Sequence, residues 1–318
     1  MRDQINRRQF LYRSGAGLGA LVAGAACSAE SRAPADSAAT AAGAVAAPRD
    51  SVGGAPGRAA QISVQLYTLR TLMERDVPGT LRKVADIGYR NVELAGYQGR
   101  TPHELRRMLD GLGLEAPSAH LPLADFEKQL AATLAGAQVV GHRYVICPYA
   151  QGTTTADWQR LAARFNRFGR AAQERGMQFA YHNHDHEFWP LAGGTRTAYD
   201  VLLADTDPEL VKMELDLFWA VRAGQDPVQL FERHPGRFPL VHAKDMRDVR
   251  GAQQLPPDAG EAIGPHIADV GAGEIDFSRI FAASAKGGIE YYVVEHDNPA
   301  EPLASVRASY ANLRRLLT

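Results

Sequence analysis

Cysteine is scarce in this sequence, with two residues among 318, Cys27 and Cys147. Two thiols are too few for a disulfide framework or for a zinc site built from cysteines. Cys27 lies in a leader of small residues and Cys147 lies in an apolar run, so we do not expect the two to pair. The fold must therefore be stabilised by its core.

An excess of charge of one sign is also missing. The 35 Lys and Arg residues are balanced by 36 Asp and Glu residues, which leaves a formal net charge of −1. A chain with balanced charge is not attracted as a whole to nucleic acid or to an anionic membrane surface. We therefore expect no nucleic-acid partner.

Long apolar runs are missing as well. The apolar run near the N-terminus, residues 15–26, is too short to span a bilayer. It follows Arg7-Arg8-Gln9-Phe10-Leu11, and a paired arginine ahead of Phe-Leu and a small apolar run is typical of a twin-arginine export signal. We predict a signal peptide over residues 1–27 and export to the periplasm.

Two processing sites are compatible with this leader. Cys27 follows Gly24-Ala25-Ala26 and resembles a lipoprotein site, although Gly24 stands where such sites usually have leucine. Ala25-Ala26 equally suits an ordinary signal-peptidase site. Residues 28–60 are rich in Ala, Pro, Ser and Gly, which predicts a flexible linker. We thus expect membrane contact only through a lipid on Cys27.

From residue 61 onward, short runs rich in β-branched and aromatic residues alternate with longer helical patterns. Eight such βα units predict an α/β fold, a (β/α)8 TIM barrel that occupies residues 61–318 as one domain. A doubly wound sheet would need a glycine-rich phosphate turn after the first strand, and Thr68-Leu69-Arg70 contains no glycine. The expected strands are Ile62–Tyr67, Asn91–Leu94, Glu115–His120, Tyr144–Cys147, Gln178–His182, Val211–Asp216, Pro239–His242 and Tyr291–Glu295. The expected helices are Pro78–Ile87, Thr101–Leu112, Asp125–Ala137, Thr155–Arg175, Thr197–Ala204, Pro227–Arg233, Phe277–Lys286 and Leu303–Leu317.

The longest irregular segment is expected between the last two strands, from Met246 to Asp276. It is rich in Gly, Pro and Asp. A loop of this length inside a compact domain is usually a lid or a binding loop. We therefore expect this segment to border the functional site.

Ionisable side chains gather where the expected strands end. The carboxyl ends of barrel strands converge on one site, and charged groups there must be paired, hydrated or bound to metal. Mixed oxygen and nitrogen donors suit one divalent metal ion, for which Mn²⁺, Mg²⁺, Co²⁺, Zn²⁺ and Fe²⁺ are the candidates. The polar residues in these positions are Glu93, His120, His182, Asn183, His184, Glu187, Glu214, Asp216, His242, Lys244, Asp245, Glu295 and Asp297.

Four motifs together resemble one known family. They are Val64-Gln65-Leu66-Tyr67-Thr68-Leu69-Arg70, Tyr181-His182-Asn183-His184, Leu215-Asp216-Leu217-Phe218-Trp219 and His242-Ala243-Lys244-Asp245-Met246. Over residues 61–317 the chain is similar to the sugar phosphate isomerase/epimerase family, whose fold is a xylose isomerase-like barrel. The resemblance implies a fold and a metal site, and it says little about the substrate beyond a small sugar-like molecule.

The resemblance also implies a set of metal ligands. Members of the family hold one divalent metal through residues on strands five to eight, and Asp216, His242 and Glu295 match the last three. The strand-five ligand of the family is a glutamate, whereas His182 stands at that position here. His182 is either the fourth ligand or a residue that orients a ligand, and His184 or Glu187 could be a ligand in its place. The presence of His182 puts the two-carboxylate mechanism of the epimerases in doubt.

Three residues are expected to handle protons or negative charge. Glu295 is both a ligand and an acid/base group, and Glu93 is a second candidate base or a substrate contact. Lys244 either stabilises an enediolate or forms a salt bridge with Asp245. The expected substrate contacts are His120, His184, Glu187 and Trp219. For Trp219, packing against the barrel is the alternative.

The expected reaction begins at an α-hydroxy carbonyl group. A divalent ion acidifies the neighbouring C–H, and reprotonation of the resulting enediolate gives an isomer or an epimer of a sugar-like compound. Loss of a β-hydroxyl from the same intermediate gives dehydration, so a lyase acting on a keto-sugar, keto-glycoside or keto-inositol is the main alternative. A non-catalytic exported sugar-binding barrel is the second alternative. The sequence leaves the oligomeric state open, a homodimer included.

Overall fold

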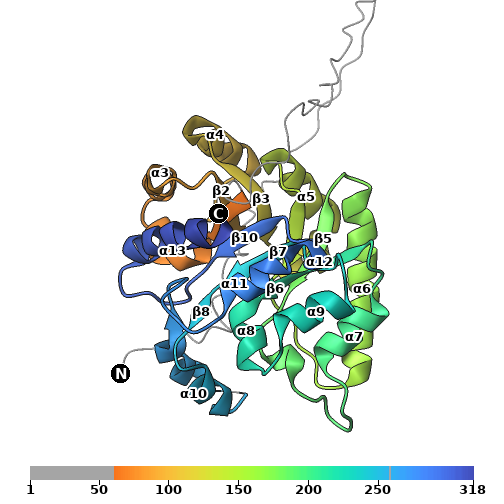
Figure 1. Cartoon of the computed structure of the whole chain (residues 1–318). Helices are drawn as coiled ribbons and strands as arrows, with labels where there is room; N and C mark the ends of the chain where they lie inside the picture. Colours follow the sequence, from red (N-terminus) through yellow and green to blue (C-terminus); the bar gives the residue numbers. More distant parts are fainter. Residues whose placement is uncertain (1–60, 258) are drawn as a thin grey trace, which may run out of the picture. The chain divides into compact units, whose positions relative to one another are not determined.

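The computed structural model describes residues 61–257 and 259–318. Within them eight parallel strands close into a barrel in the order β1-β10-β7-β6-β5-β4-β3-β2, with helices around it (Figure 1). The predicted TIM barrel is thus confirmed, whereas the predicted signal peptide, the processing site at Cys27 and the linker lie outside the described residues. The barrel strands are β1 (Ile62–Gln65), β2 (Asn91–Ala95), β3 (Glu115–His120), β4 (Tyr144–Cys147), β5 (Gln178–His182), β6 (Val211–Asp216), β7 (Leu240–Ala243) and β10 (Tyr291–Val294).

Helices follow every barrel strand, and local signals set their ends. Thr101, Thr154 and Thr197 open three of them with capping boxes, and Gly88 and Gly141 end two others in the left-handed conformation. Among the described helices, none is long and apolar enough to cross a bilayer. Outside the segment that joins β7 to α11, the helices are η3 (Leu66–Leu69), α2 (Arg70–Met73), α3 (Val77–Ile87), α4 (Pro102–Leu112), α5 (Leu123–Val140), α6 (Thr155–Gln173), η4 (His186–Phe188), α7 (Ala198–Asp205), α8 (Leu217–Arg222), α9 (Pro227–Arg233), α11 (Phe277–Ala282), α12 (Ser284–Gly287) and α13 (Pro302–Leu317).

The segment predicted as one irregular loop, Met246 to Asp276, contains regular structure, so that prediction is wrong in part. Asp245 pairs with Ala268 in a short antiparallel ribbon, and contacts between residues so far apart leave no local sequence signal. The expected helix Phe277–Lys286 is also two short helices, α11 and α12. The elements of the joining segment are β8 (Asp245–Met246), α10 (Val249–Gln254), η5 (Gly260–His266) and β9 (Ile267–Ala268).

The interior of the barrel changes from apolar to polar along the strands. Successive residues of a strand point to opposite faces, so the residue two positions before an inward-pointing residue lies beneath it. Ala180 has this position relative to His182, and Leu240 has it relative to His242. They belong to a small buried apolar cluster of Tyr144, Ile146, Ala180, Leu240 and Val293. The polar side chains at the strand ends thus lie above a buried apolar layer inside the barrel.

Candidate active site

The four residues predicted to bind metal lie at the carboxyl ends of four neighbouring strands. His182 ends β5, Asp216 ends β6, His242 lies on β7, and Glu295 directly follows β10. Asp216 and His242 are register partners in the sheet. All four side chains are buried, which is costly for ionisable groups unless they are paired or bind a cation.

These four side chains come together as one cluster. One donor atom of each lies within 4.8 Å of the donor atoms of the others. Nε2 of His182 and Nδ1 of His242 each lie 3.9 Å from Oδ2 of Asp216. Nδ1 of His242 also lies 2.9 Å from Oε2 of Glu295. The structure therefore places His182 beside the other three predicted ligands, at the position where the family has a glutamate.

The chemistry of this cluster fits a divalent cation. Two imidazoles and two carboxylates are the mixed donors found in zinc, manganese, iron and cobalt sites. Oδ2 of Asp216 is buried and makes no hydrogen bond of regular geometry among the described residues. Its ion pair is with the Lys244 ammonium at 3.0 Å, so this oxygen already attracts positive charge and could also contact a bound cation. Burial raises the pKa of Asp216 to about 6, against the opposing effect of Lys244 and His242.

Lys244 supplies a positive charge beside the same carboxylates. Its Nζ lies 3.0 Å from Oδ2 of Asp216, 2.8 Å from Oε2 of Glu295 and 2.8 Å from Oδ1 of Asp297. Burial alone would lower the pKa of Lys244, but these three carboxylates outweigh burial and raise the pKa well above its ordinary value. Lys244 is therefore a fixed cation that faces the cluster.

Asp245 fixes the segment after β7 and does not form the salt bridge with Lys244 that was the alternative for that lysine. Side chains alternate in direction along a strand, so neighbouring residues point apart. The carboxylate of Asp245 accepts hydrogen bonds of 2.8–3.2 Å from the backbone N–H groups of Met246, Gly271, Gly273 and Ile275. Asp245 thus anchors both ends of the segment that was predicted to border the site.

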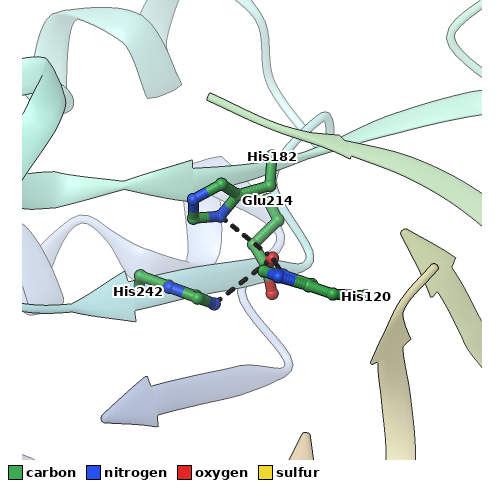
Figure 2. A group of neighbouring side chains, drawn as sticks. All are labelled: His120, His182, Glu214 and His242. Atoms are coloured by element: carbon green, nitrogen blue, oxygen red, sulfur yellow. Dashed lines mark hydrogen bonds and ion pairs between the residues drawn. The ribbon is translucent and has the colours of Figure 1, made fainter. Parts of the chain in front are cut away.

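A second group of side chains lies next to the first and shares two histidines with it. Figure 2 shows three imidazoles that converge on one carboxylate, that of Glu214. Its Oε2 lies 2.6 Å from Nε2 of His120, 3.2 Å from Nδ1 of His182 and 3.3 Å from Nε2 of His242. The nitrogens of His182 and His242 that face Glu214 are the ones that do not face Asp216. These two rings therefore link the groups.

Glu93 on β2 completes the second group. Its Oε1 accepts a hydrogen bond from Nε2 of Gln65 at 2.7 Å, and lies 2.8 Å from Nε2 of His242 and 3.1 Å from Nε2 of His120. Burial alone would raise the pKa of Glu93, but His120 and His242 outweigh burial and hold the pKa well below its ordinary value. A fully buried carboxylate behind His242 is poorly placed for its predicted role as a general base.

His120 is the member of the second group that reaches solvent. Its side chain is 12% exposed, whereas those of Glu93 and Glu214 are fully buried. Burial alone would lower the pKa of His120, but Glu93 and Glu214 outweigh burial and raise the pKa to about 9. A protonated imidazole at the mouth of the barrel can donate a proton to a substrate, so the predicted substrate contact has a chemical role available to it.

Two other predicted substrate contacts border the cluster. The ring of His184 lies 5.1 Å from that of His182 and 5.7 Å from that of Trp219. Nζ of Lys244 lies 5.4 Å from the Trp219 ring. Nε1 of Trp219 is buried without a hydrogen-bond partner in the part of the chain that the structure describes. Trp219 thus offers the site both an aromatic face and an N–H donor.

Glu187 has a different position from the one predicted. It is fully buried, and it accepts hydrogen bonds from the Tyr181 hydroxyl at 2.6 Å and from the backbone N–H of His184 at 2.8 Å. Both oxygens are thus engaged inside the loop that carries His184, so Glu187 supports this loop and does not face a substrate. With His184 and His186 it forms a third group of donor atoms within 4.8 Å of one another.

Glu214 and Asp297 contact predicted site residues. Both were noted among the polar residues at the strand ends, but the sequence analysis assigned neither of them a role. A signal for Glu214 was present, because it lies two residues before Asp216 on β6 and the alternation of a strand points both into the barrel. Asp297 follows the end of β10, where this alternation no longer applies. Its contact with Lys244 depends on the path of a loop and has no local signal.

The comparisons with known proteins agree with the fold. The chain matches the family model described as xylose isomerase-like TIM barrel over residues 81–316. It is 31% identical over 147 residues to an inosose dehydratase from Lacticaseibacillus casei, a match that covers 44% of this chain and 47% of that protein. The chain thus spans about half the length of the first curated relatives it matches.

Two further matches extend over more of the chain. An inosose dehydratase from Geobacillus kaustophilus is 28% identical over 249 residues, which cover 65% of this chain and 78% of that protein. Among solved structures, a sugar phosphate isomerase/epimerase from Parabacteroides distasonis superposes with a TM-score of 0.67 at 27% identity. That match covers 79% of this chain and 96% of the other.

Proposed function

The chain belongs to the xylose isomerase-like TIM barrel family, and we propose that it is a metal-dependent lyase that removes water from a keto-sugar or keto-inositol. The observation that carries the proposal is the cluster of His182, Asp216, His242 and Glu295, whose donor atoms meet at the ends of four neighbouring strands. The names of two relatives, both called inosose dehydratase, support elimination of water over isomerisation.

The cluster would hold one divalent ion. Such an ion, when bound, withdraws electron density from a ketone oxygen and so acidifies the adjacent C–H group. Lys244 adds a fixed positive charge 2.8 Å from Oε2 of Glu295, where it stabilises negative charge that develops on the substrate oxygen. Trp219 provides an apolar face for the ring of a cyclic substrate and an N–H donor for one of its hydroxyls.

Elimination of water needs one base and one acid. We assign the base to Glu295, whose carboxylate takes the proton from the carbon next to the ketone. The C–H electron pair forms the new C=C bond while the C–O bond at the next carbon breaks. His120 gives its proton to the departing hydroxyl, which leaves as water. The pKa of His120, raised to about 9 by its two carboxylate neighbours after they outweigh burial, keeps that proton available at neutral pH.

The residue at the end of β5 favours elimination over epimerisation. Epimerases of this family place a second carboxylate there, so that one carboxylate removes a proton and the other returns it on the opposite face. His182 stands at that position here. Burial together with the nearby His242 and His120 holds the pKa of His182 well below its ordinary value. A neutral imidazole suits metal binding and leaves the site with a single carboxylate base and a separate acid.

Mass spectrometry and NMR of the reaction products test the proposal. The full-length protein, loaded in turn with Mn²⁺, Co²⁺ and Zn²⁺, is incubated with keto-inositols, keto-sugars and 3-keto-glycosides. A lyase gives a product lighter by one water, with the signals of a new double bond. A product of unchanged mass would instead support an isomerase or epimerase, and binding without any conversion would support a sugar-binding barrel.

A matched pair of variants separates the site from the fold. Asp216→Asn removes a carboxylate of the cluster and is expected to abolish elimination, because a neutral amide oxygen binds a divalent ion far more weakly than a carboxylate. Asp110→Asn changes a carboxylate whose side chain is 64% exposed on α4, and is expected to leave elimination unchanged. Equal activity in both variants would refute the site assignment.

We further propose export through the twin-arginine route. The support is the sequence Arg7-Arg8-Gln9-Phe10-Leu11 ahead of a small apolar run. Replacement of Arg7 and Arg8 together by lysine is expected to keep the full-length chain in the cytoplasm. Export of that variant at the wild-type level would contradict the proposal.

A further inference from the structure

We propose that Glu214 is a positioning residue that decides which nitrogen of His182 faces the cation site. The inference deepens the proposed function and rests on its metal cluster. Glu214 and His182 are register partners on neighbouring strands, β6 and β5, and both side chains point into the barrel. Figure 2 shows the two side chains in contact, with His120 and His242 beside them.

The contacts of Glu214 set its role as an acceptor. Its Oε2 has three imidazole nitrogens within 3.3 Å, those of His120, His182 and His242. A single proton on this oxygen could serve only one of the three, so the others must donate. His120 makes the shortest contact, 2.6 Å, from a ring that also lies 3.1 Å from Glu93 and is well placed to carry a proton. His182 therefore donates Nδ1–H to Glu214 at 3.2 Å.

The direction of this hydrogen bond fixes the other nitrogen of His182. In a neutral imidazole with a proton on Nδ1, Nε2 carries a lone pair. That lone pair lies 3.9 Å from Oδ2 of Asp216, too far for a hydrogen bond. Within the described residues, Oδ2 of Asp216 has an ion pair with Nζ of Lys244 at 3.0 Å but makes no hydrogen bond of regular geometry. Two buried acceptors that face each other across this distance are stabilised by a cation between them.

His242 repeats the arrangement with a different carboxylate. Its Nε2 lies 2.8 Å from Oε1 of Glu93, and its Nδ1 lies 3.9 Å from Oδ2 of Asp216. Each histidine of the cluster is thus backed by a buried glutamate, as metal-binding histidines commonly are. Glu214 also compensates for the missing glutamate at the end of β5. It places a negative charge directly behind His182, the neutral ligand at that position.

The same contacts make Glu214 an unsuitable direct ligand. His120, His182, Glu214 and His242 also form a set of donor atoms within 4.8 Å. However, Glu214 already lies 2.6 Å from Nε2 of His120. Two ligands on a tetrahedral zinc ion with bonds of about 2.0 Å lie roughly 3.3 Å apart. All three imidazoles of this set lie within 3.3 Å of one oxygen of Glu214. In the other cluster Nδ1 of His242 also lies 2.9 Å from Oε2 of Glu295, but the nitrogens of His182 and His242 stand 3.9 Å from Oδ2 of Asp216, which leaves room for an ion on that side.

Metal affinity in the absence of substrate tests the proposal first. The full-length protein and its variants are titrated with Zn²⁺ and Co²⁺ against a competing chelator. Glu214→Leu removes the acceptor and is expected to weaken binding by about 10- to 100-fold. Glu214→Gln keeps an oxygen acceptor and is expected to lose less than about tenfold. Asp110→Asn, a change at an exposed carboxylate on α4, is the control and is expected to keep the wild-type affinity.

Histidine NMR gives a readout that a purely structural role would not move. In ¹⁵N-histidine protein loaded with Zn²⁺, His182 is identified by the signals that His182→Gln removes. The proposal predicts a proton on Nδ1 and zinc on Nε2 in the wild type and in Glu214→Gln. Zinc on Nδ1 of His182 would overturn it, even if Glu214→Leu fails to fold. Wild-type affinity in a folded Glu214→Leu protein would overturn it as well.

These outcomes are distinct from failure of the proposed function. A protein that shows the predicted affinities and tautomer, yet eliminates no water from any keto-polyol, would refute the lyase and leave the role of Glu214 intact. A protein that eliminates water and binds zinc equally well without Glu214 would refute the positioning role alone.

Discussion

The Nε2 atom of His120 lies 2.6 Å from Oε2 of Glu214, across the boundary between the mouth of the barrel and its buried interior. The imidazole is 12% exposed and the carboxylate is fully buried. The ring of His120 is also stacked on that of His242, with centroids 5.4 Å apart. His120 is therefore the point at which the buried network of carboxylates and histidines reaches solvent.

Removal of the acidic proton of His120 is expected to slow catalysis without loss of the metal. His120→Gln keeps a hydrogen-bond donor for Glu214 but cannot supply a proton to a leaving hydroxyl. We expect kcat to fall by about 10²-fold or more, the usual contribution of a general acid, while the Kd for Zn²⁺ changes by less than about threefold. Steady-state kinetics and metal titration check the two parts. His103→Gln, a change at an exposed histidine on α4, is the control. An unchanged kcat in His120→Gln would show that His120 is not the general acid.

Acid is expected to destabilise the fold through His142. Burial lowers the pKa of His142 to about 4, although its hydrogen bond of 2.7 Å to the Ala116 carbonyl opposes the shift. The unfolded chain has a pKa near 6.5 at this residue, so between about pH 6.5 and pH 4 only the unfolded state takes up the proton. Stability from His142 is therefore present above this window and is lost as pH falls through it, by about 3 kcal/mol in all.

Urea unfolding at pH 7, 5.5 and 4.5 measures this effect against His142→Asn. Asparagine keeps an N–H donor for the Ala116 carbonyl and does not titrate. The stability advantage of the wild type over the variant should shrink as the pH falls. A difference that stays constant over the three pH values would show that His142 does not titrate in this window.

A close approach between α6 and Leu210, the residue before β6, predicts opposite effects at two glycines. A Cβ added to Gly169 would lie 2.2 Å from the carbonyl oxygen of Leu210, which is backbone and cannot move aside, whereas one added to Gly111 would meet nothing within 4 Å. Gly169→Ala is therefore expected to cost about 1–3 kcal/mol or more. Gly111→Ala on α4 is expected to gain about 0.5–1 kcal/mol. Thermal unfolding of both variants is the measurement, and equal shifts in Tm would contradict the packing.

The carboxylate of Asp245 is expected to hold the segment between β7 and α11 in place. Asp245→Asn replaces one acceptor oxygen by an NH2 group that faces backbone donors, which leaves buried N–H groups unsatisfied at about 1–3 kcal/mol each. We expect faster limited proteolysis within residues 249–266 and a lower Tm. Cleavage at the wild-type rate would mean that the segment is held by other contacts. Asp110→Asn serves as the surface control.

The strands were predictable because their signal is local. β3, β4, β5 and β6 have the predicted bounds, since each is a short run of residues that fits a buried strand and ends in a polar residue or, for β4, is followed by Pro148. The first strand ends at Gln65, two residues earlier than predicted. There the side chain accepts a hydrogen bond from the backbone N–H of Tyr67 at 3.0 Å and opens a helical turn.

The sequence predicted which residues meet in the cluster, but it did not predict how deeply each side chain is buried. Their position at the expected strand ends, together with the family resemblance, indicated His182, Asp216 and His242, but position at a strand end does not show which side chain reaches the mouth of the barrel. Glu93 illustrates the limit, because three donors from other strands enclose it. Contacts of this kind join residues that are far apart in sequence, and only the closed barrel brings them together.

Anomalous X-ray diffraction from crystals of the zinc-loaded full-length protein tests the central claim most directly. The account predicts a strong zinc peak bonded to Nε2 of His182, Nδ1 of His242 and one carboxylate oxygen each from Asp216 and Glu295. A peak instead on the group of His184, His186 and Glu187, or between Glu214 and His120, would contradict it.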